Sequence, residues 1–199
     1  MIIGLTGKYC AGKNYVAALL EARGLPVIDV DKLGYQALEL EKEVIFAQFG
    51  ADLRKTDGSL DRRLLGQRVF GAPEKLAALE AIVHPVANRL TDEWAAAQLA
   101  VKNPAQNGHC VINAALLHRS SVFHRLDRII LVTAPFFTRI IRARRRDKLP
   151  LREILTRFAS QKSFNTQYLL KKAEIYRVGN PGLFGCPERR INKFLEGIN

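Results

Sequence analysis

The chain has few cysteines and no long apolar run, and each shortage excludes a class of protein. Its three cysteines, Cys10, Cys110 and Cys186, lie far apart and match neither a disulfide framework nor the spacing of a metal site. No apolar stretch approaches the roughly 18 to 20 residues that cross a bilayer, and the sequence opens directly into a short apolar run. We therefore expect a cytoplasmic protein without a membrane span or a secretory leader.

Acidic residues are also scarce. Asp and Glu number 19 against 31 Lys and Arg, which gives a formal net charge of +12. This balance favours anionic partners, namely nucleic acid, a membrane surface or phosphorylated metabolites, and does not choose among them. The chain shows no internal repeat, low-complexity tract or linker, so its 199 residues indicate one core domain with insertions.

The most specific motif is Gly7-x-x-x-x-Gly12-Lys13, which follows the apolar run 2–5. Glycines at both positions let backbone N–H groups approach phosphate oxygens closely, and Lys13 brings a positive charge to the outer phosphates. Helix-forming residues come next, and the N-terminus of a helix also favours an anion. The motif therefore predicts a phosphate-binding loop and favours nucleotides among the anionic partners. The alternative is a plain strand-to-helix turn.

Two loop residues qualify this prediction. Asn14 stands where Ser or Thr usually follows the lysine and binds magnesium through its hydroxyl. An amide oxygen is the most that Asn14 can offer, so we expect a weakened metal site and an intact phosphate site. Cys10 is either a small space-filling residue or a thiol whose pKa is lowered near Lys13.

Apolar runs alternate with helical patterns along the chain, which is typical of a parallel α/β sheet. The runs predict strands at 2–5, 26–31, 110–113, 128–133 and 175–178. The helical patterns predict helices at 13–23, 33–49, 61–102, 135–147 and 151–172, and a last helix from 188. The pattern over 61–102 is interrupted at 71–73 and strained near His84-Pro85.

Two aspartates close the second expected strand, at the carboxyl end where open α/β sheets bind ligands. Asp29 and Asp31 are two residues apart, so on a strand they would point to the same face. One could accept the proton of a hydroxyl that attacks phosphorus, while the other holds magnesium through water or orients the substrate. The alternative is that one of them caps the helix expected from Leu33.

Arginines are densest between 139 and 146. Arg142 and Arg146 are four residues apart, so a helix places them on one face, where two guanidinium groups could clamp a phosphoryl group during transfer. The same basic face could instead be solvated or touch RNA.

Two further segments carry candidates. The sequence Asp57-Gly-Ser-Leu-Asp-Arg62 predicts a turn and then a helix cap at Ser59 or Asp61, and Arg62 could reach a substrate phosphate. His84 lies in an aliphatic helical pattern, where a lone histidine is more often a structural hydrogen-bonding group.

Taken together, these motifs resemble the dephospho-CoA kinase family from Ile2 to about Gly182. The resemblance is carried, in order along the chain, by the phosphate loop and by the segments 27–31, 57–66, 80–85, 113–117 and 142–161. It implies a P-loop kinase fold, in which a parallel sheet flanked by helices carries a helical substrate-binding insertion and a mobile lid. It also implies transfer of the γ-phosphate of ATP to the ribose 3′-hydroxyl of dephospho-CoA, which gives coenzyme A.

The same resemblance implies a single kinase domain over residues 1–199. Its core would comprise about 1–56, 106–136 and 173–199, its substrate-binding region about 57–105, and its lid about 137–172.

The family's functional positions carry over onto residues of this chain. Asp31, Lys13 and Arg142 would be catalytic, with Asp31 as the base, and dephospho-CoA would lie against Asp31, Asp57, Arg62 and His84. The expected ATP-binding residues are Gly7, Lys8, Tyr9, Cys10, Ala11, Gly12, Lys13, Asn14, Tyr15, Arg142 and Arg146. Magnesium would accompany ATP, with a weak contact at Asn14.

The sequence leaves two other functions open. One is a kinase for another nucleotide-like acceptor, and the other is a degenerate binder of nucleotide or RNA that makes no product. Nucleic acid is not the expected partner, and the sequence does not fix the oligomeric state.

Overall fold

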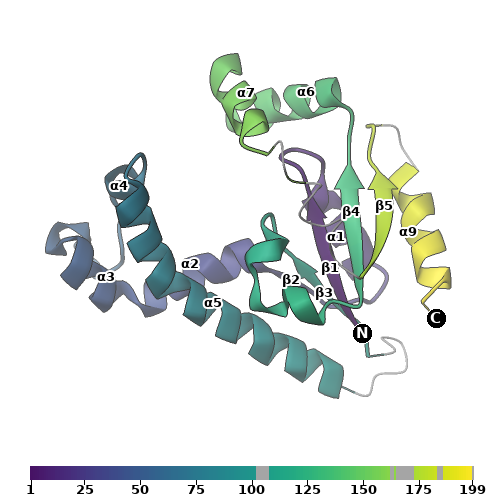
Figure 1. Ribbon diagram of the computed structural model, residues 1–199, viewed down its shortest axis with the longest axis horizontal. Helices are drawn as coiled ribbons and strands as arrows, with labels where there is room; N and C mark the ends of the chain where they lie inside the picture. The colour runs from purple at the N-terminus through teal and green to yellow at the C-terminus, as the bar shows by residue number, and fades with distance from the viewer. Residues whose placement is uncertain (102–107, 162–163, 165–172, 183–185, 199) are drawn as a thin grey trace. The chain divides into compact units, whose positions relative to one another are not determined.

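The structure is a computed structural model that describes residues 1–101, 108–161, 164, 173–182 and 186–198 (Figure 1). The chain divides into two compact units, one made of Met1–Asp29 and Ala95–Asn199 and the other of Val30–Trp94. The expected substrate-binding region began near residue 57, whereas the second unit begins at Val30. The segment 30–56 therefore lies with the helical unit and not with the sheet.

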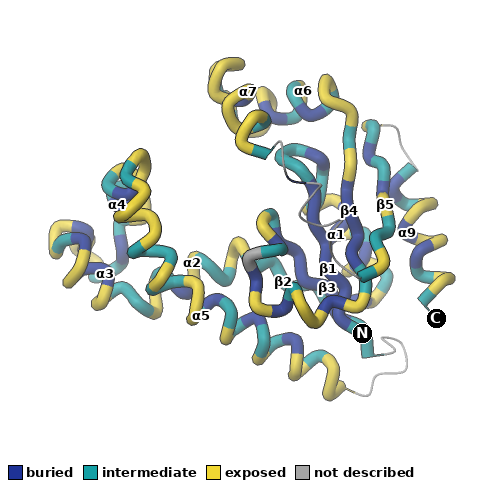
Figure 2. The backbone as a smooth tube through the Cα atoms, viewed as in Figure 1, coloured by how far each residue is buried: buried dark blue, intermediate teal, exposed yellow. Residues whose placement is uncertain are grey.

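The first unit is built on a five-stranded parallel sheet with the strand order β2-β3-β1-β4-β5 (Figure 1). Its strands are β1 (Ile2–Gly7), β2 (Val27–Asp29), β3 (Cys110–Asn113), β4 (Arg128–Thr133) and β5 (Glu174–Gly179). All residues of β1 and β3 are buried, as Figure 2 shows, because parallel strands are covered on both faces. The expected α/β fold is confirmed.

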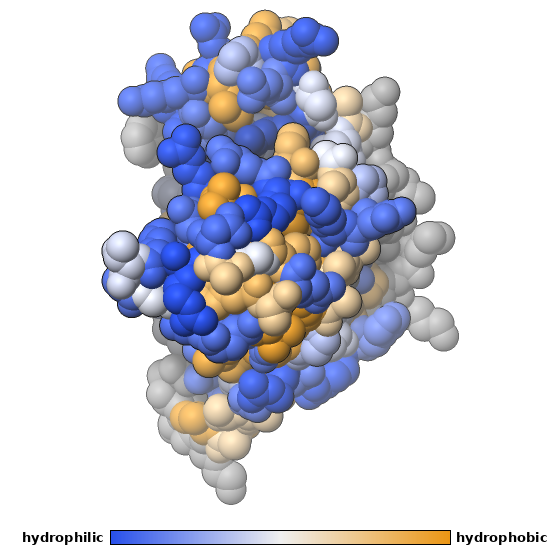
Figure 3. Space-filling view, turned by 90° about the vertical axis from the view of Figure 1, so that its left-hand side faces the viewer, coloured by the Kyte–Doolittle hydropathy of each residue, from blue (hydrophilic) through white to orange (hydrophobic). Residues whose placement is uncertain are grey.

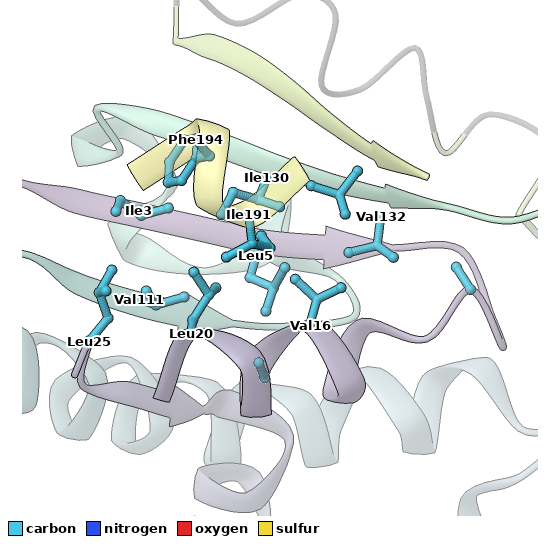
Figure 4. Close-up of a cluster of buried hydrophobic side chains, with 13 residues drawn as sticks. Ile3, Leu5, Val16, Leu20, Leu25, Val111, Ile130, Val132, Ile191 and Phe194 are labelled. Atoms are coloured by element: carbon cyan, nitrogen blue, oxygen red, sulfur yellow. The ribbon is translucent and has the colours of Figure 1, made fainter. Parts of the chain in front are cut away.

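Helices cover one face of the sheet. They are α1 (Lys13–Glu21) and α9 (Cys186–Glu196), and Figure 4 shows Val16 and Leu20 of α1 and Phe194 of α9 in one cluster with Ile3 and Leu5 of β1. These side chains are buried, and each contributes on the order of 2 kcal/mol of hydrophobic free energy to folding.

The opposite face is packed just as closely. A Cβ atom on Gly4 would lie 2.5 Å from a methyl group of Leu117 and 2.8 Å from one of Leu126. Leu117 belongs to η2 (Leu117–Arg119), and Leu126 follows η3 (Ser121–Arg125). Two short 3-10 helices thus cover β1 where a larger residue would not fit.

Two further helices of the first unit follow β4. They are α6 (Phe136–Asp147) and α7 (Leu151–Ala159), the region expected to form a lid. The single helix expected over 151–172 is wrong in its end, because α7 stops at Ala159 and a turn follows at 160–161. The rest of that expected helix lies, except for Phe164, outside the described residues.

The second unit is helical. It contains α2 (Val30–Leu40), α3 (Lys42–Phe49), η1 (Ala51–Leu53), α4 (Arg62–Val69) and most of α5 (Pro73–Ala100). A separate apolar core joins these elements and includes Ile45, Phe46, Phe49, Leu53, Leu60, Leu65 and Val69. Asp61 caps α4, since its Oδ1 accepts a hydrogen bond of 2.9 Å from the N–H of Leu64. The cap expected at Ser59 or Asp61 is thus confirmed at Asp61.

Further differences from the sequence expectation concern α2, α3 and α5. The second strand ends at Asp29 and α2 begins at Val30, so Asp31 lies in the first turn of a helix, where a carboxylate favours the helix dipole. The single helix expected over 33–49 is divided at Glu41 into α2 and α3. Pro85 lies inside α5 without ending it. None of the helices in the described ranges is both long and apolar enough to cross a membrane.

Candidate functional site

The loop between β1 and α1 has the two glycines where side chains would not fit. A Cβ atom on Gly7 would lie 2.8 Å from the carbonyl oxygen of Val132, and one on Gly12 would lie 2.1 Å from Nδ2 of Asn180. Gly12 also has a φ of +96°, which glycine adopts without strain. Close packing within the unit therefore requires both glycines, in addition to the close approach of a phosphate on which the sequence argument rested.

Two side chains hold the carbonyl group of Ala11. Asn180 donates from Nδ2 to this oxygen at 3.1 Å, and Arg142 of α6 donates from Nη1, also at 3.1 Å. Arg142 also donates from Nη2 to Asn180 Oδ1 at 3.0 Å. The carbonyl of Ala11 and the side chains of Arg142 and Asn180 are therefore each hydrogen-bonded to the other two. Asn180 is only 5% exposed and directly follows β5, and its own N–H donates to the carbonyl of Thr133.

A second carbonyl of the loop is held in the same way. Arg139 donates from Nε to the carbonyl oxygen of Tyr9 at 2.8 Å and lies over the ring of Phe158 at 4.3 Å. Arg139 is 8% exposed, and its burial lowers the pKa of its guanidinium group. On the other side of the same residue, the N–H of Tyr9 donates to Gln161 Oε1 at 2.7 Å.

These contacts orient the peptide groups of the loop. In a trans peptide the C=O of one residue and the N–H of the next point in opposite directions. Because Arg139 and Asn180 hold the carbonyls of Tyr9 and Ala11, the N–H groups of Cys10 and Gly12 point to the other side of the loop. The helix α1 begins one residue later, at Lys13, so its first amides extend this set of donors. The arrangement suits an anion with several oxygens.

The tyrosine of the loop connects it to the end of α6. The phenolic hydroxyl of Tyr9 donates to Asp147 Oδ2, and Arg146 donates to both oxygens of the same carboxylate, from Nε at 2.7 Å and from Nη2 at 3.1 Å. The hydrogen bonds from Arg146, followed by that from Tyr9, lower the pKa of Asp147 to about 2. Arg142 thus contacts the loop backbone, whereas Arg146 is paired with Asp147, and Arg144 and Arg145 are exposed.

Asn14 faces the sheet. Its Oδ1 accepts a hydrogen bond of 3.4 Å from Nδ2 of Asn113, the last residue of β3. In the register of the sheet, Asn113 pairs with Asp29 at the end of β2. Within the described ranges no group of three or more His, Cys, Asp or Glu side chains could hold a metal ion. Asn14 and Asn113 can offer amide oxygens to a cation, and Asp29 at the end of the neighbouring strand carries the nearest carboxylate in the sheet register.

Cys10 and Tyr15 of the loop have side chains in different environments. Burial raises the pKa of the Cys10 thiol, so the space-filling interpretation holds and a lowered thiol pKa does not. The hydroxyl of Tyr15 donates to Glu188 Oε1 of α9, and this bond raises the pKa of Tyr15. Its side chain is therefore directed at α9, which leaves its main chain as the part that could serve a phosphate.

The sequence predicts Asp29 and Asp31 on one strand, but in the structure they belong to different elements. Asp29 ends β2 in the first unit, whereas Asp31 belongs to α2 in the second. The expectation that both carboxylates point to one face of a strand was therefore wrong. The cause is that α2 begins before Asp31, at Val30.

The candidates for acceptor binding all lie in the second unit and are exposed. Arg62 lies over the ring of Tyr35 at 4.8 Å, and Tyr35 is one helical turn after Asp31 on α2. The structure thus brings Arg62 to the face of α2 that carries Asp31. Asp57 accepts a hydrogen bond of 2.9 Å from the N–H of Ser59 within its own turn. The side-chain hydroxyl of Ser59, followed by this N–H, lowers the pKa of Asp57. His84 lies on α5.

Apolar side chains are exposed on this unit as well. Figure 3, viewed from the side of α3 and α4, shows apolar residues gathered among hydrophilic ones. The exposed large apolar residues of the unit are Tyr35, Leu40, Val44, Phe70 and Leu76. A ligand with both charged and apolar parts could find contacts of either kind here.

Sequence reasoning missed four residues that shape the site, namely Asn113, Asp147, Gln161 and Asn180, and it counted Arg139 only as a member of the basic segment. A signal existed for two of them. Asn113 ends a buried strand and Asn180 directly follows one, and polar residues at the carboxyl edge of a parallel sheet are candidates for a ligand site.

Known proteins resemble this chain over most of its length. The model of the dephospho-CoA kinase family matches residues 1–177. A curated relative from Treponema pallidum (strain Nichols), a dephospho-CoA kinase, is 31% identical over an alignment of 201 positions that covers 98% of this chain and 93% of the relative.

Solved structures are similar as well. The crystal structure of the Thermus thermophilus protein TT1252 has a TM-score of 0.81 and 33% identity, and the match covers 100% of this chain and 98% of that one. A dephospho-CoA kinase from Campylobacter jejuni has a TM-score of 0.65 and 25% identity, over 100% and 97% of the two chains.

Proposed function

Because this chain belongs to the dephospho-CoA kinase family, we propose that it transfers the γ-phosphoryl group of ATP to the 3′-hydroxyl of dephospho-CoA and so forms coenzyme A. One structural observation supports this proposal directly. Arg139, Arg142 and Asn180 hold two carbonyl groups of the loop so that its amides face the opposite side. Such a row of N–H groups ahead of a helix binds the phosphates of a nucleotide.

In this proposal the first unit binds ATP. The residues from Gly7 to Tyr15 surround its phosphates, mainly through main-chain N–H groups, and Lys13 neutralises the outer oxygens. Arg142 and Arg146 belong to a lid formed by α6 and α7 and stabilise charge on the transferred group. For Arg146 this requires exchanging the carboxylate of Asp147 for a phosphate.

The second unit binds the acceptor. Asp31 is exposed at the start of α2 and accepts the proton of the attacking 3′-hydroxyl. Arg62, beside the same face of α2, pairs with a phosphate of dephospho-CoA. Asp57 and His84, exposed on the same unit, contact other polar groups of the acceptor.

Magnesium supplies, when bound with ATP, positive charge that neutralises the β and γ oxygens. The residues present fit the ion. Magnesium prefers oxygen ligands and keeps several of its waters, and the amide oxygens of Asn14 and Asn113 lie at the N-terminus of α1, with that of Asn113 buried. Neither carries a charge, so the metal contact is weaker than that of a site with a carboxylate.

We also propose the cytoplasm as the location. All three cysteines are free thiols in the structure, which suits a reducing compartment.

The decisive experiment measures coenzyme A formation from ATP and dephospho-CoA, with nucleoside monophosphates as competing acceptors. Lys13→Ala and Asp31→Asn should each lower kcat by about 100-fold or more, with unchanged circular dichroism. Exposed residues on the same two units serve as controls, and we expect Lys193→Ala and Glu43→Gln to retain activity. Phosphorylation of a nucleoside monophosphate in place of dephospho-CoA would point to another acceptor. ATP binding without any product would point to a degenerate homologue.

A further inference from the structure

Asn113 contains a buried polar atom without a partner. The residue is 2% exposed, and its Nδ2 donates to Asn14. Its Oδ1 has no hydrogen-bond partner within the part of the chain that the structure describes. Buried amide oxygens are nearly always satisfied, because leaving one unpaired destabilises the fold. An unpaired oxygen at this place therefore indicates a ligand that supplies the missing partner.

The position of this oxygen restricts what the ligand can be. The side chain of Asn113 is hydrogen-bonded to that of Asn14, the second residue of α1. The amide group of Asn113 therefore lies at the N-terminal turn of α1, which follows the phosphate loop. An amide oxygen accepts hydrogen bonds or binds cations, and it repels the oxygens of a phosphate. The partner must be a hydrogen-bond donor or a cation that arrives with the anion.

A magnesium ion carried by a nucleotide meets both conditions. It is hard, takes oxygen ligands and retains waters, whose hydrogens can be donated. In phosphate loops the residue after the lysine contacts this ion, and in this chain that residue is Asn14.

We propose that Asn113 is a second residue of the magnesium site, in which it orients the amide of Asn14 and accepts a hydrogen bond from a water of the ion. The two side chains form a neutral pair of oxygen donors. The inference rests on the proposed function insofar as ATP must bind at the loop.

The neutral pair has a consequence for affinity. Asn14 and Asn113 bring no negative charge of their own, so this pair attracts free divalent cations only weakly, since ligand charge is a main determinant of affinity. The ion therefore binds this chain as part of its complex with ATP and not before it. Asn113→Asp adds one charge and should let the carboxylate accept from the amide nitrogen of Asn14, which turns Asn14 Oδ1 toward the ion.

The test uses Mn²⁺ as the probe, measured by electron paramagnetic resonance with the full chain, with and without ATP. We expect the native chain to bind Mn²⁺ tightly only with ATP. Asn113→Asp should tighten Mn²⁺ binding about tenfold, and Asn113→Leu, which has nearly the same shape, should weaken it several-fold without weakening metal-free ATP binding. The matched control is Ser120→Ala, because Ser120 Oγ is also buried without a partner among the described residues.

The outcomes separate this inference from the proposed function. Equal Mn²⁺ affinities in the native chain, Asn113→Asp and Asn113→Leu would overturn the role of Asn113, whether or not coenzyme A forms. Affinities that change as expected in a chain that makes no coenzyme A would keep the metal site and overturn the kinase. If Asn113→Leu does not fold, Asn113→Asp alone decides, and an unchanged affinity in that variant overturns the inference.

Discussion

Tyr9 of the phosphate loop donates its phenolic hydroxyl to the carboxylate of Asp147, the last residue of α6. The same carboxylate binds Arg146, whose guanidinium group lies over the Tyr9 ring at 5.2 Å. The ring also packs against Phe158 of α7 with a centroid separation of 5.7 Å. One side chain of the loop therefore joins it to both helices of the proposed lid.

Tyr9→Phe should weaken ATP binding and leave folding nearly unchanged. The substitution removes one hydrogen bond and keeps the ring contacts, so we expect the KM for ATP to rise about three- to tenfold, as for the loss of a hydrogen bond to a charged group. Steady-state kinetics measure the change. The control is Tyr176→Phe, which removes a hydroxyl bound to the carbonyl of Arg190, remote from the loop. An equal rise of the KM for ATP in both variants would show that the hydrogen bond from Tyr9 to Asp147 has no specific role in ATP binding.

Asn180→Ala should cost both stability and affinity. The substitution leaves the carbonyl of Ala11 with one donor fewer and removes an acceptor from Arg142, and we expect a loss of about 1–3 kcal/mol in the free energy of unfolding. The freed peptide also loosens the loop, so the Kd for ATP should rise about tenfold or more. Denaturant unfolding and calorimetric titration measure the two effects. Asn192→Ala, which removes an exposed partner of Arg23, should change neither by much.

Gly12→Ala and Gly24→Ala distinguish two ways in which an added Cβ lowers the free energy of unfolding at a residue with positive φ. One is backbone strain, and the other is a steric clash with neighbouring atoms. Both glycines have positive φ, +96° and +84°, so each substitution should cost about 1 kcal/mol in backbone strain. A Cβ on Gly24 meets nothing within 4 Å, whereas one on Gly12 would lie 2.1 Å from Asn180 Nδ2. We therefore expect Gly12→Ala to destabilise the protein by clearly more than Gly24→Ala and to abolish ATP binding. Equal losses in thermal unfolding would show that the contact with Asn180 is easily relieved.

The lowered pKa of Asp147 predicts the pH range over which this residue of the proposed lid stabilises the folded protein. Its pKa falls from an ordinary value of 3.8 to about 2 on folding, so its ionised form stabilises the folded state. This stabilisation is complete above about pH 5 and is lost as the pH falls through 3.8 toward 2. The stability difference between the native chain and Asp147→Asn should therefore be constant from pH 5 to 8 and shrink below pH 4. Urea unfolding across this range tests it, and a difference that varies between pH 5 and 8 would contradict the assignment.

The sheet and its central loop could be predicted because their signals are local. Strands buried on both faces appear as unbroken apolar runs, such as those of β1 and β4, and the two glycines and the lysine of the loop are adjacent to one of them. The turn at Asp57 and the cap at Asp61 are equally local.

The remainder of the site depends on contacts between residues far apart in sequence. Asn180 reaches the carbonyl of Ala11 across 169 residues, and Arg139 reaches that of Tyr9 across 130. Arg139 looks like one more surface arginine until the fold buries it against Phe158. The start of α2 was missed for another reason. Val27, Ile28 and Val30 are β-branched and favour a strand on both sides of Asp29, and only tertiary structure ends the strand at Asp29.

The anchoring of the Tyr9 and Ala11 carbonyls has a consequence for successive catalytic cycles. Arg139, Arg142 and Asn180 fix the conformation of the phosphate loop before any ligand binds. The loop therefore needs little reorganisation when a nucleotide binds, and it keeps its conformation when the diphosphate product leaves. The rate at which ADP is exchanged for ATP should then be set by how quickly α6 and α7 move away from the phosphate loop. The loop itself stays in the conformation that binds the next nucleotide.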